Sequence, residues 1–255
     1  MDKKTKKAYE VIKDIRNVDF CLDENDELLE QQSKRDQRSF ERQQRLAQIV
    51  ATEIYKKKTH FIFELIQNAE DNEYNKGQKP EVFLRLLDND PTQTEGSHGC
   101  FCLFNNEDGF SEKNIRAICD FSNTTKDRNE NKGYIGEKGI GFKSVFLVSR
   151  TPHINSNGYK ICFDEQPHER MKLGYIVPKW VDIESTIKDI SRHETSIVLP
   201  LKSKEHFQTV ENGLSDLEPE VVLFLGKLQG LTIQTPGKQN NFNVLKDTSS
   251  YPYVT

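Results

Sequence analysis

Apolar residues recur at two different spacings along this chain. Intervals of three and four, which place side chains on one face of a helix, predict helices over residues 7–17, 40–57 and 60–72. Alternation of apolar and polar residues predicts strands instead, near residues 81–87, 100–104, 159–163, 171–177 and 196–201. A turn-rich loop separates the first two strands, so they are expected to pair as a hairpin.

Two further helices are suggested by their boundaries. Thr59 is expected to cap the helix over residues 60–72, and Ser111 to cap one running to Phe121, with Asn114 placed to complete a capping box. Leu217–Leu228 predicts a terminal helix. Residues 123–132 are polar enough to predict a mobile, lid-like segment. This order predicts a two-layer α/β sandwich, with a mixed and mainly antiparallel sheet covered by helices on one face.

Composition limits the classes of protein that fit. The chain has 255 residues, 35% of them hydrophobic and 30% charged, and a formal net charge of −4. We expect a charged helical extension over residues 1–44, the main domain over 45–235, and a tail or the start of a following segment over 236–255. The net charge gives no electrostatic reason to expect nucleic acid or a membrane as a partner.

The cysteines and the lack of long apolar runs bear on location. The chain has five cysteines, an odd number, all in apolar surroundings, which favours reduced thiols. It begins with lysines rather than an apolar signal segment, and no run approaches the roughly 20 apolar residues that span a bilayer. A cytoplasmic or nuclear location is therefore expected.

The helix over residues 60–72 carries unexpected polar residues. Glu64, Asn68 and Asp71 follow one another at spacings of four and three, so they share one helical face. A carboxylate and a carboxamide one turn apart suit a water-activating base beside a ligand for a hard cation. The alternative is an amphipathic helix whose polar face is simply solvated.

A glycine-rich block over residues 133–144 is the second candidate. Its glycines allow close backbone approach, so its amides suit phosphate oxygens. Neither common phosphate motif fits: Phe142 separates Gly141 from Lys143-Ser144, against the P-loop pattern, and Ser144 stands where the dinucleotide fingerprint needs its last glycine. The alternative is a surface hinge with no ligand.

Together these blocks resemble the ATP-binding domain of the GHKL superfamily, which contains gyrase, the ninety-kilodalton heat-shock chaperone, histidine kinases and MutL. Glu64–Asn72 is similar to the first conserved box of that family, and Gly136-x-x-Gly139-x-Gly141 to its later glycine box. Glu194–Leu201 resembles the closing strand of the chaperone, in which a threonine precedes alternating apolar residues. The three occur in the family's order over roughly residues 45–235, which implies the Bergerat-type ATP-binding fold.

One branch of this superfamily is particularly similar. Residues 59–61, 114–119 and 133–146 resemble the branch containing sacsin and the plant protein NO VEIN. In that branch the domain usually lies at the front of, or inside, a much larger polypeptide.

The chain departs from the family at the box that contacts adenine. The family pattern is Asp-x-Gly-x-Gly, and aligning its last glycine on Gly109 places Asn105 at the aspartate position. An asparagine oxygen can still accept from the adenine amino group, although it lacks charge. Asp108 is the other acidic candidate, but it comes three residues too late in this register.

The resemblance implies a role for each matching residue. Glu64 would polarise the attacking water, Asn68 would bind Mg²⁺, and Asn105 would accept from adenine. Asp71 and Thr195 would belong to the polar network near the base, and Lys138 or Lys143 would add charge near the phosphates. The nucleotide-binding set is completed by lid and glycine-box residues and Gly109, namely Ser122, Thr124, Gly136, Gly139, Ile140, Gly141 and Phe142.

The resemblance therefore implies Mg²⁺-dependent ATP binding with slow hydrolysis by a chaperone-like domain, in which the lid couples nucleotide to conformational change or dimerisation. We expect weak ATPase turnover, because a cationic residue from a following domain often completes the γ-phosphate site. A homodimer or a protein client is the expected macromolecular partner. Two alternatives stay open, a nucleotide-dependent interaction switch without hydrolysis and a degenerate scaffold that binds no nucleotide. A histidine kinase is disfavoured because no phosphoacceptor helix precedes the domain.

Overall fold

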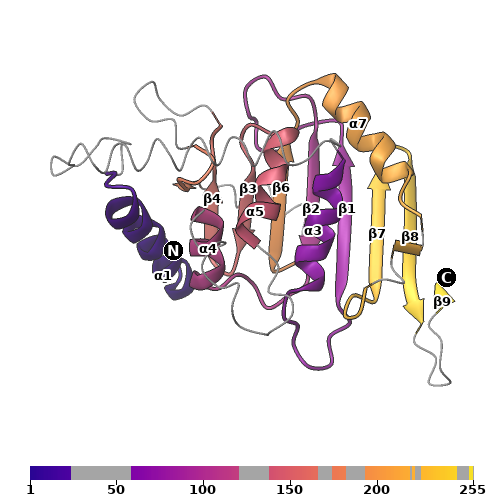
Figure 1. Ribbon diagram of the computed structural model, residues 1–255, viewed down its shortest axis with the longest axis horizontal. Helices are drawn as coiled ribbons and strands as arrows, with labels where there is room; N and C mark the ends of the chain where they lie inside the picture. The colour runs from indigo at the N-terminus through magenta and orange to yellow at the C-terminus, as the bar shows by residue number, and fades with distance from the viewer. Residues whose placement is uncertain are drawn as a thin grey trace, which may run out of the picture.

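A single mixed sheet organises the part of the chain that the computed structural model describes, residues 1–23, 59–120, 138–165, 174–181, 193–218, 220–221, 225–245 and 253–254. Its strand order is β5-β4-β3-β6-β2-β1-β7-β8-β9 (Figure 1). The strands are β1 Glu81–Leu87, β2 Cys100–Asn105, β3 His153–Ser156, β4 Tyr159–Cys162, β5 Lys179–Trp180, β6 Thr195–Pro200, β7 Gly230–Thr235, β8 Lys238–Leu245 and β9 Tyr253–Val254.

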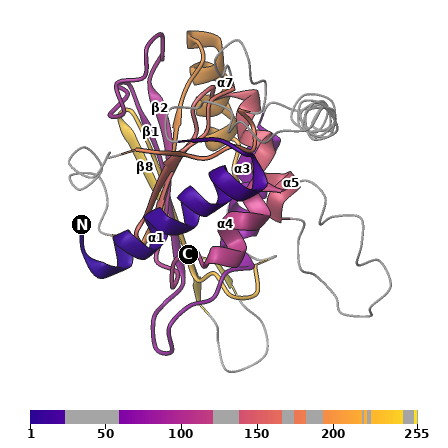
Figure 2. The ribbon, with the colours of Figure 1, turned by 90° about the vertical axis from the view of Figure 1, so that its left-hand side faces the viewer.

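Most neighbouring strands run antiparallel. The predicted hairpin is confirmed, because β1 and β2 pair antiparallel from Val82 opposite Asn105 to Leu87 opposite Cys100. Among the described strands, β1 and β7 form the parallel pair. The helices α3, α4 and α5 lie on the same side of this sheet (Figure 2). The predicted two-layer α/β sandwich with a mainly antiparallel sheet is confirmed.

The described helices are short and amphipathic. They are α1 Lys3–Asp14, which continues into a π-helical turn at Ile15–Asp19, α3 His60–Glu70, α4 Glu112–Cys119, α5 Lys138–Lys143, which continues into a 3-10 turn at Ser144–Leu147, and α7 Lys204–Ser215. None of the helices in this described part is long and apolar enough to cross a membrane.

Helix boundaries follow the sequence in one case and not in another. Ser111 caps α4 as predicted: its side chain accepts from the backbone of Asn114, whose own side chain accepts from the Ser111 backbone. Thr59 precedes α3 but makes no capping hydrogen bond with its side chain. Its backbone is already helical, so the hydroxyl is not presented to the first free amides. The predicted Thr59 cap is wrong.

The N-terminal helix is packed into the same core as the sheet. Its inward-facing residues Ala8, Ile12 and Ile15 are at most 3% exposed. Arg16 is buried as well and donates to the carbonyl oxygen of Pro178. The apolar face of α1 therefore contributes to the stability of the domain, while the predicted domain limits stay a prediction.

Two predicted elements are wrong where the structure describes them. Tyr175–Val177 forms a turn and an extended segment instead of a strand, and the Tyr175 carbonyl bonds a lysine side chain instead of a neighbouring strand. Within the predicted helix over residues 217–228, the described residues are not α-helical: residues 220–221 have 3-10 geometry and residues 225–228 form no helix. There the Glu70 carboxylate accepts from the backbone amides of Gly226, Lys227 and Leu228. The described helix that precedes these residues is α7, which ends at Ser215.

Some predictions fall on residues that the structure does not describe. The helix expected over residues 40–57, the lid over residues 123–132 and the predicted ligands Ser122, Thr124 and Gly136 lie outside the described residues.

Candidate functional site

The polar face predicted on α3 lies at the border between core and solvent. The apolar residues of α3 are buried except for Phe63, which is 46% exposed; the buried ones are Phe61, Ile62, Leu65, Ile66 and Ala69. Glu64, Asn68 and Asp71 are half-buried. The Glu64 side chain is 27% exposed. This placement avoids the cost of burying an isolated carboxylate and leaves the group accessible to water.

The two sequence blocks meet at Glu64. Gly141 of α5 approaches its carboxylate so closely that a Cβ at position 141 would clash with Oε2 of Glu64. On the other side, His60 Nδ1 lies 3.4 Å from Oε1 of the same carboxylate, one helical turn away. We call Glu64, Asn68 and Gly141 the helix-face cluster. It joins a helical carboxylate, a side-chain amide and the buried backbone of Gly141.

The rest of the glycine box is partly described. Lys138, Gly139 and Ile140 lie in the first turn of α5. Phe142 is 2% exposed, with its ring centroid 5.9 Å from that of Phe163. Phe142 is therefore a core residue at the base of the glycine block, so any contact with a ligand comes from its backbone.

Lys143 does not face the helix-face cluster. Its side chain is completely buried, and Nζ donates to the carbonyl oxygens of Ile118 and Tyr175. Burial lowers the pKa of the Lys143 ammonium to about 7. Lys143 ties the end of α4 to the segment that contains Tyr175, and we assign it no contact with phosphate.

A second group of polar residues gathers where three central strands end. The register places Asn105 of β2 opposite Thr195 of β6, and Thr195 opposite Ser156 of β3. Glu107 follows two residues after β2. All four side chains are at least 95% buried. We call Asn105, Glu107, Ser156 and Thr195 the strand-end cluster.

Both polar atoms of the Asn105 side-chain amide form hydrogen bonds. Its Oδ1 accepts from the backbone amide of Glu107 at 2.8 Å, and its Nδ2 donates to the Tyr74 hydroxyl at 2.8 Å. Tyr74 donates in turn to the carbonyl oxygen of Ala69 on α3, and burial raises the pKa of its phenol. Asn105 thus connects the turn after β2 to the end of α3.

Glu107 is the functional candidate that the sequence prediction missed. Its carboxylate is 5% exposed, and Oε1 accepts from the Thr195 hydroxyl at 2.6 Å. Thr195 and Ser156 hydroxyls also lie 2.6 Å apart. Burying a carboxylate is costly unless other groups compensate for its charge. In the predicted alignment Glu107 stood at a glycine position, and only its pairing with Thr195 reveals a buried carboxylate at this place.

The turn that carries Glu107 depends on Gly109. Gly109 has a φ of +88°, and a Cβ there would lie 2.8 Å from Cβ of Asn157 and 3.0 Å from Cγ of Glu194. A side chain at this position would be both strained and crowded. Asp108, the alternative acidic candidate, is exposed and is held through its backbone amide by the carbonyl of Glu73.

Asp71 lies at the C-terminal end of α3. It is the C-cap of α3, and its Oδ1 lies 3.4 Å from Nε2 of Gln67 on the preceding turn. Within the described ranges, no three His, Cys, Asp or Glu side chains are grouped to hold a metal ion. A Mg²⁺ ion here would therefore depend on Asn68 together with oxygens of its own ligand or water, which is usual for this cation.

Comparisons with known proteins agree with the predicted branch. Residues 39–210 match the family model described as the Sacsin domain. Over 235 residues, 38% are identical to the Arabidopsis thaliana protein NO VEIN, covering 86% of this chain and 8% of NO VEIN. Human sacsin is 29% identical over 127 residues, which cover 47% of this chain and 3% of sacsin. The chain thus spans a small part of both relatives.

Proposed function

Because the chain belongs to the sacsin domain family, we propose that it binds ATP with Mg²⁺ and hydrolyses the ATP slowly. The observation that carries this proposal is the contact between the two sequence blocks, in which Gly141 lies directly on the Glu64 carboxylate. Glycine backbone beside a half-exposed carboxylate provides amide donors and a base at one place. The helix-face cluster is therefore the phosphate end of the proposed site.

At the phosphate end, Asn68 and Glu64 have separate roles. Asn68 is half-buried on the same face of α3 as Glu64, and its side-chain oxygen is a suitable ligand for a hard cation. A Mg²⁺ ion held there would neutralise charge on the phosphate oxygens. Glu64 orients the attacking water and accepts its proton, because its half-buried carboxylate is accessible to water.

At the base end, we assign adenine recognition to Glu107 in preference to Asn105. A carboxylate accepts strongly from the amino group of adenine, whereas guanine presents an acceptor at the same edge and would be repelled. Thr195 holds one oxygen of Glu107, which fixes the direction of the carboxylate. Asn105 supports this arrangement by holding the Glu107 amide.

Calorimetric titration of the chain with ATP, a non-hydrolysable ATP analogue and GTP, each with and without Mg²⁺, tests this function. The expected result is Mg²⁺-dependent binding of both adenine nucleotides and no binding of GTP. Equal binding of GTP would contradict the role of Glu107. If none of the three binds, the domain is a scaffold without nucleotide.

Hydrolysis is tested separately from binding by the rate of phosphate release. We expect slow release that depends on Glu64. If ATP binds and protects the chain from proteolysis but no phosphate is released, the function is that of a nucleotide-dependent interaction switch. The proposal also includes chaperone-like action on a protein client and nucleotide-dependent dimerisation. The chain covers 8% of NO VEIN and 3% of sacsin, so nothing known of either whole relative is carried over to it as a fact.

A further inference from the structure

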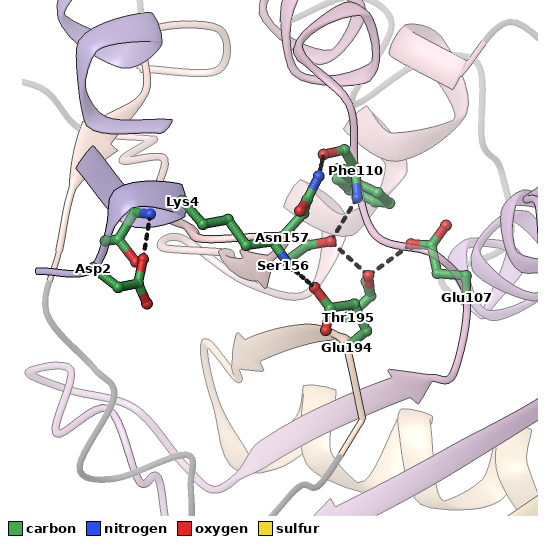
Figure 3. Close-up of polar contacts among 9 residues, drawn as sticks. Asp2, Lys4, Glu107, Phe110, Ser156, Asn157, Glu194 and Thr195 are labelled. Atoms are coloured by element: carbon green, nitrogen blue, oxygen red, sulfur yellow. Dashed lines mark hydrogen bonds and ion pairs between the residues drawn. The ribbon is translucent and has the colours of Figure 1, made fainter. Parts of the chain in front are cut away.

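The N-terminal helix makes polar contacts at the outer side of the strand-end cluster. Lys4 Nζ on α1 lies 2.6 Å from Oε1 of Glu194, the residue immediately before Thr195 (Figure 3). In the same region, Gly158 allows the turn between β3 and β4 to approach α1, since a Cβ there would lie 3.1 Å from the backbone of Lys4 and Thr5. The helix thus contacts residues that flank β6 and β3, two of the strands whose ends form the cluster.

These contacts continue inward as an unbroken series. Glu194 packs its side-chain carbons against Gly109, and Asn157 donates to the carbonyl oxygen of Phe110 at 2.8 Å. The Phe110 amide donates to Ser156 Oγ, which contacts Thr195 Oγ1, and Thr195 donates to Glu107 (Figure 3). Together these contacts join the loop that carries Glu107 to the residues that α1 contacts.

The other end of the N-terminal segment is held against α4. Arg116 of α4 contacts Asp14 of α1 and Asp19 of the following turn, as well as Glu112 on its own helix. Tyr9 packs edge-on against Trp180 of β5, with ring centroids 5.2 Å apart. The segment therefore spans from the strand-end cluster to the helix that precedes the predicted lid residues.

We infer that Lys4 and Glu194 are positioning residues, through which the N-terminal helix sets the geometry of the Glu107–Thr195 pair and hence the affinity for nucleotide. This inference rests on the proposed function. The side chains of Lys4 and Glu194 are 52% and 40% exposed, and exposed ion pairs of this kind contribute little to global stability. Their effect is therefore expected on the position of the loop and on binding, with folding nearly unchanged.

Charge reversal tests this inference in the full chain. The variants are Lys4→Glu, Glu194→Lys and the double exchange, with Lys79→Glu as matched control. Lys79 and Glu81 form a similar pair at 3.0 Å, 45% and 46% exposed, and their side chains take no part in the series of contacts from α1 to Glu107. Two quantities are measured: hydrogen exchange of the Phe110 amide without nucleotide, and the Kd for Mg-ATP at low salt and at high salt.

Each single reversal should speed exchange at Phe110 and weaken ATP binding about two- to five-fold, the range expected for breaking one exposed pair. The double exchange and Lys79→Glu should both behave as wild type, and high salt should abolish the differences in Kd. Unchanged exchange in both single variants, or a double variant as impaired as the singles, would overturn the inference. If wild type binds no ATP, the proposed function fails, and the exchange measurement still decides whether α1 positions the loop.

Discussion

The two ends of the proposed site differ in how their polar groups are held. In the strand-end cluster, Asn105 and Thr195 are each 1% exposed and Glu107 is 5% exposed, and hydrogen bonds between protein groups join them. In the helix-face cluster, the Glu64 side chain is 27% exposed and lies against the buried backbone of Gly141. The side chains of the strand-end cluster are held in place by the sheet, whereas Glu64 of the helix-face cluster is partly open to solvent.

This difference follows from the elements that carry the residues. Adjacent strands place Asn105, Thr195 and Ser156 in register, so buried polar groups satisfy one another without a ligand. On the helix face, Glu64 and Asn68 are only half-buried, and the Glu64 carboxylate lies 3.4 Å from His60 one turn away. We therefore expect changes at the strand ends to alter folding and binding together. Changes on the helix face should alter hydrolysis at Glu64 and Mg²⁺-dependent binding at Asn68, with folding nearly unchanged.

The largest expected effect is on ATP hydrolysis, at the phosphate end of the proposed site. Glu64→Ala should lower phosphate release at least about 100-fold, the usual contribution of a general base, with little change in the Kd for ATP. Gln67→Ala, at an exposed position of the same helix, should retain wild-type release. Wild-type hydrolysis by Glu64→Ala would show that another group activates water.

At the strand ends, Thr195→Val should destabilise the fold by about 2 kcal/mol, because it removes a hydrogen bond to a buried carboxylate without changing side-chain volume. Urea unfolding measures the change. Thr209→Val is the matched control, since the Thr209 hydroxyl bonds the Glu205 carbonyl at an exposed position, and it should cost less than about 0.5 kcal/mol. An equal loss of stability in both variants would mean that the buried hydrogen bond of Thr195 contributes no more than an exposed one.

Acid should lower the stability of the fold through His153. This residue of β3 is 6% exposed, neither ring nitrogen has a hydrogen-bond partner, and burial lowers its pKa from 6.5 to about 4. As pH falls through this range, the unfolded chain takes up a proton before the folded chain does, so stability decreases. The loss attributable to His153 should reach about 2 kcal/mol at pH 5.

Urea unfolding at pH 7 and pH 5 checks this dependence on His153. His153→Phe should reduce the difference between the two pH values, whereas His98→Ala, at an exposed position, should leave it unchanged. An unaltered pH dependence in His153→Phe would contradict the assignment to His153.

The smallest effect concerns the turn beneath Glu107. Gly109 and Gly237 both have positive φ, but a Cβ at Gly237 has no neighbour within 4 Å, whereas one at Gly109 would crowd Asn157 and Glu194. Gly109→Ala should therefore destabilise the fold by about 1 kcal/mol more than Gly237→Ala, and weaken ATP binding where Gly237→Ala does not. Equal thermal shifts in the two variants would show that close packing at Gly109 is unimportant.

Local patterns in the sequence were sufficient for much of the architecture. The α3 helix, the hairpin of β1 and β2, and the Ser111–Asn114 capping box were all predicted, because each depends on residues close together in the chain. Elements that depend on distant contacts were predicted wrongly. The Glu70 carboxylate accepts from the amides of Gly226, Lys227 and Leu228, so the end of the predicted helix over residues 217–228 is not helical.

The candidate site shows the same limit. The spacing of Glu64, Asn68 and Asp71 correctly indicated a shared polar face, since helical geometry alone determines it. The importance of Glu107 could not be predicted, because it depends on Thr195, a residue in β6 that only the strand order brings beside it. Alignment to the family glycine pattern directed attention to Asn105 instead.

The account depends most on the claim that Glu107 recognises the base. Calorimetric titration of Mg-ATP into Glu107→Gln, beside wild type and Asn105→Asp, measures this directly. We expect Glu107→Gln to remain folded and to bind ATP at least about ten-fold more weakly, since it keeps the shape of the side chain and loses its charge. Wild-type affinity in Glu107→Gln would contradict the claim.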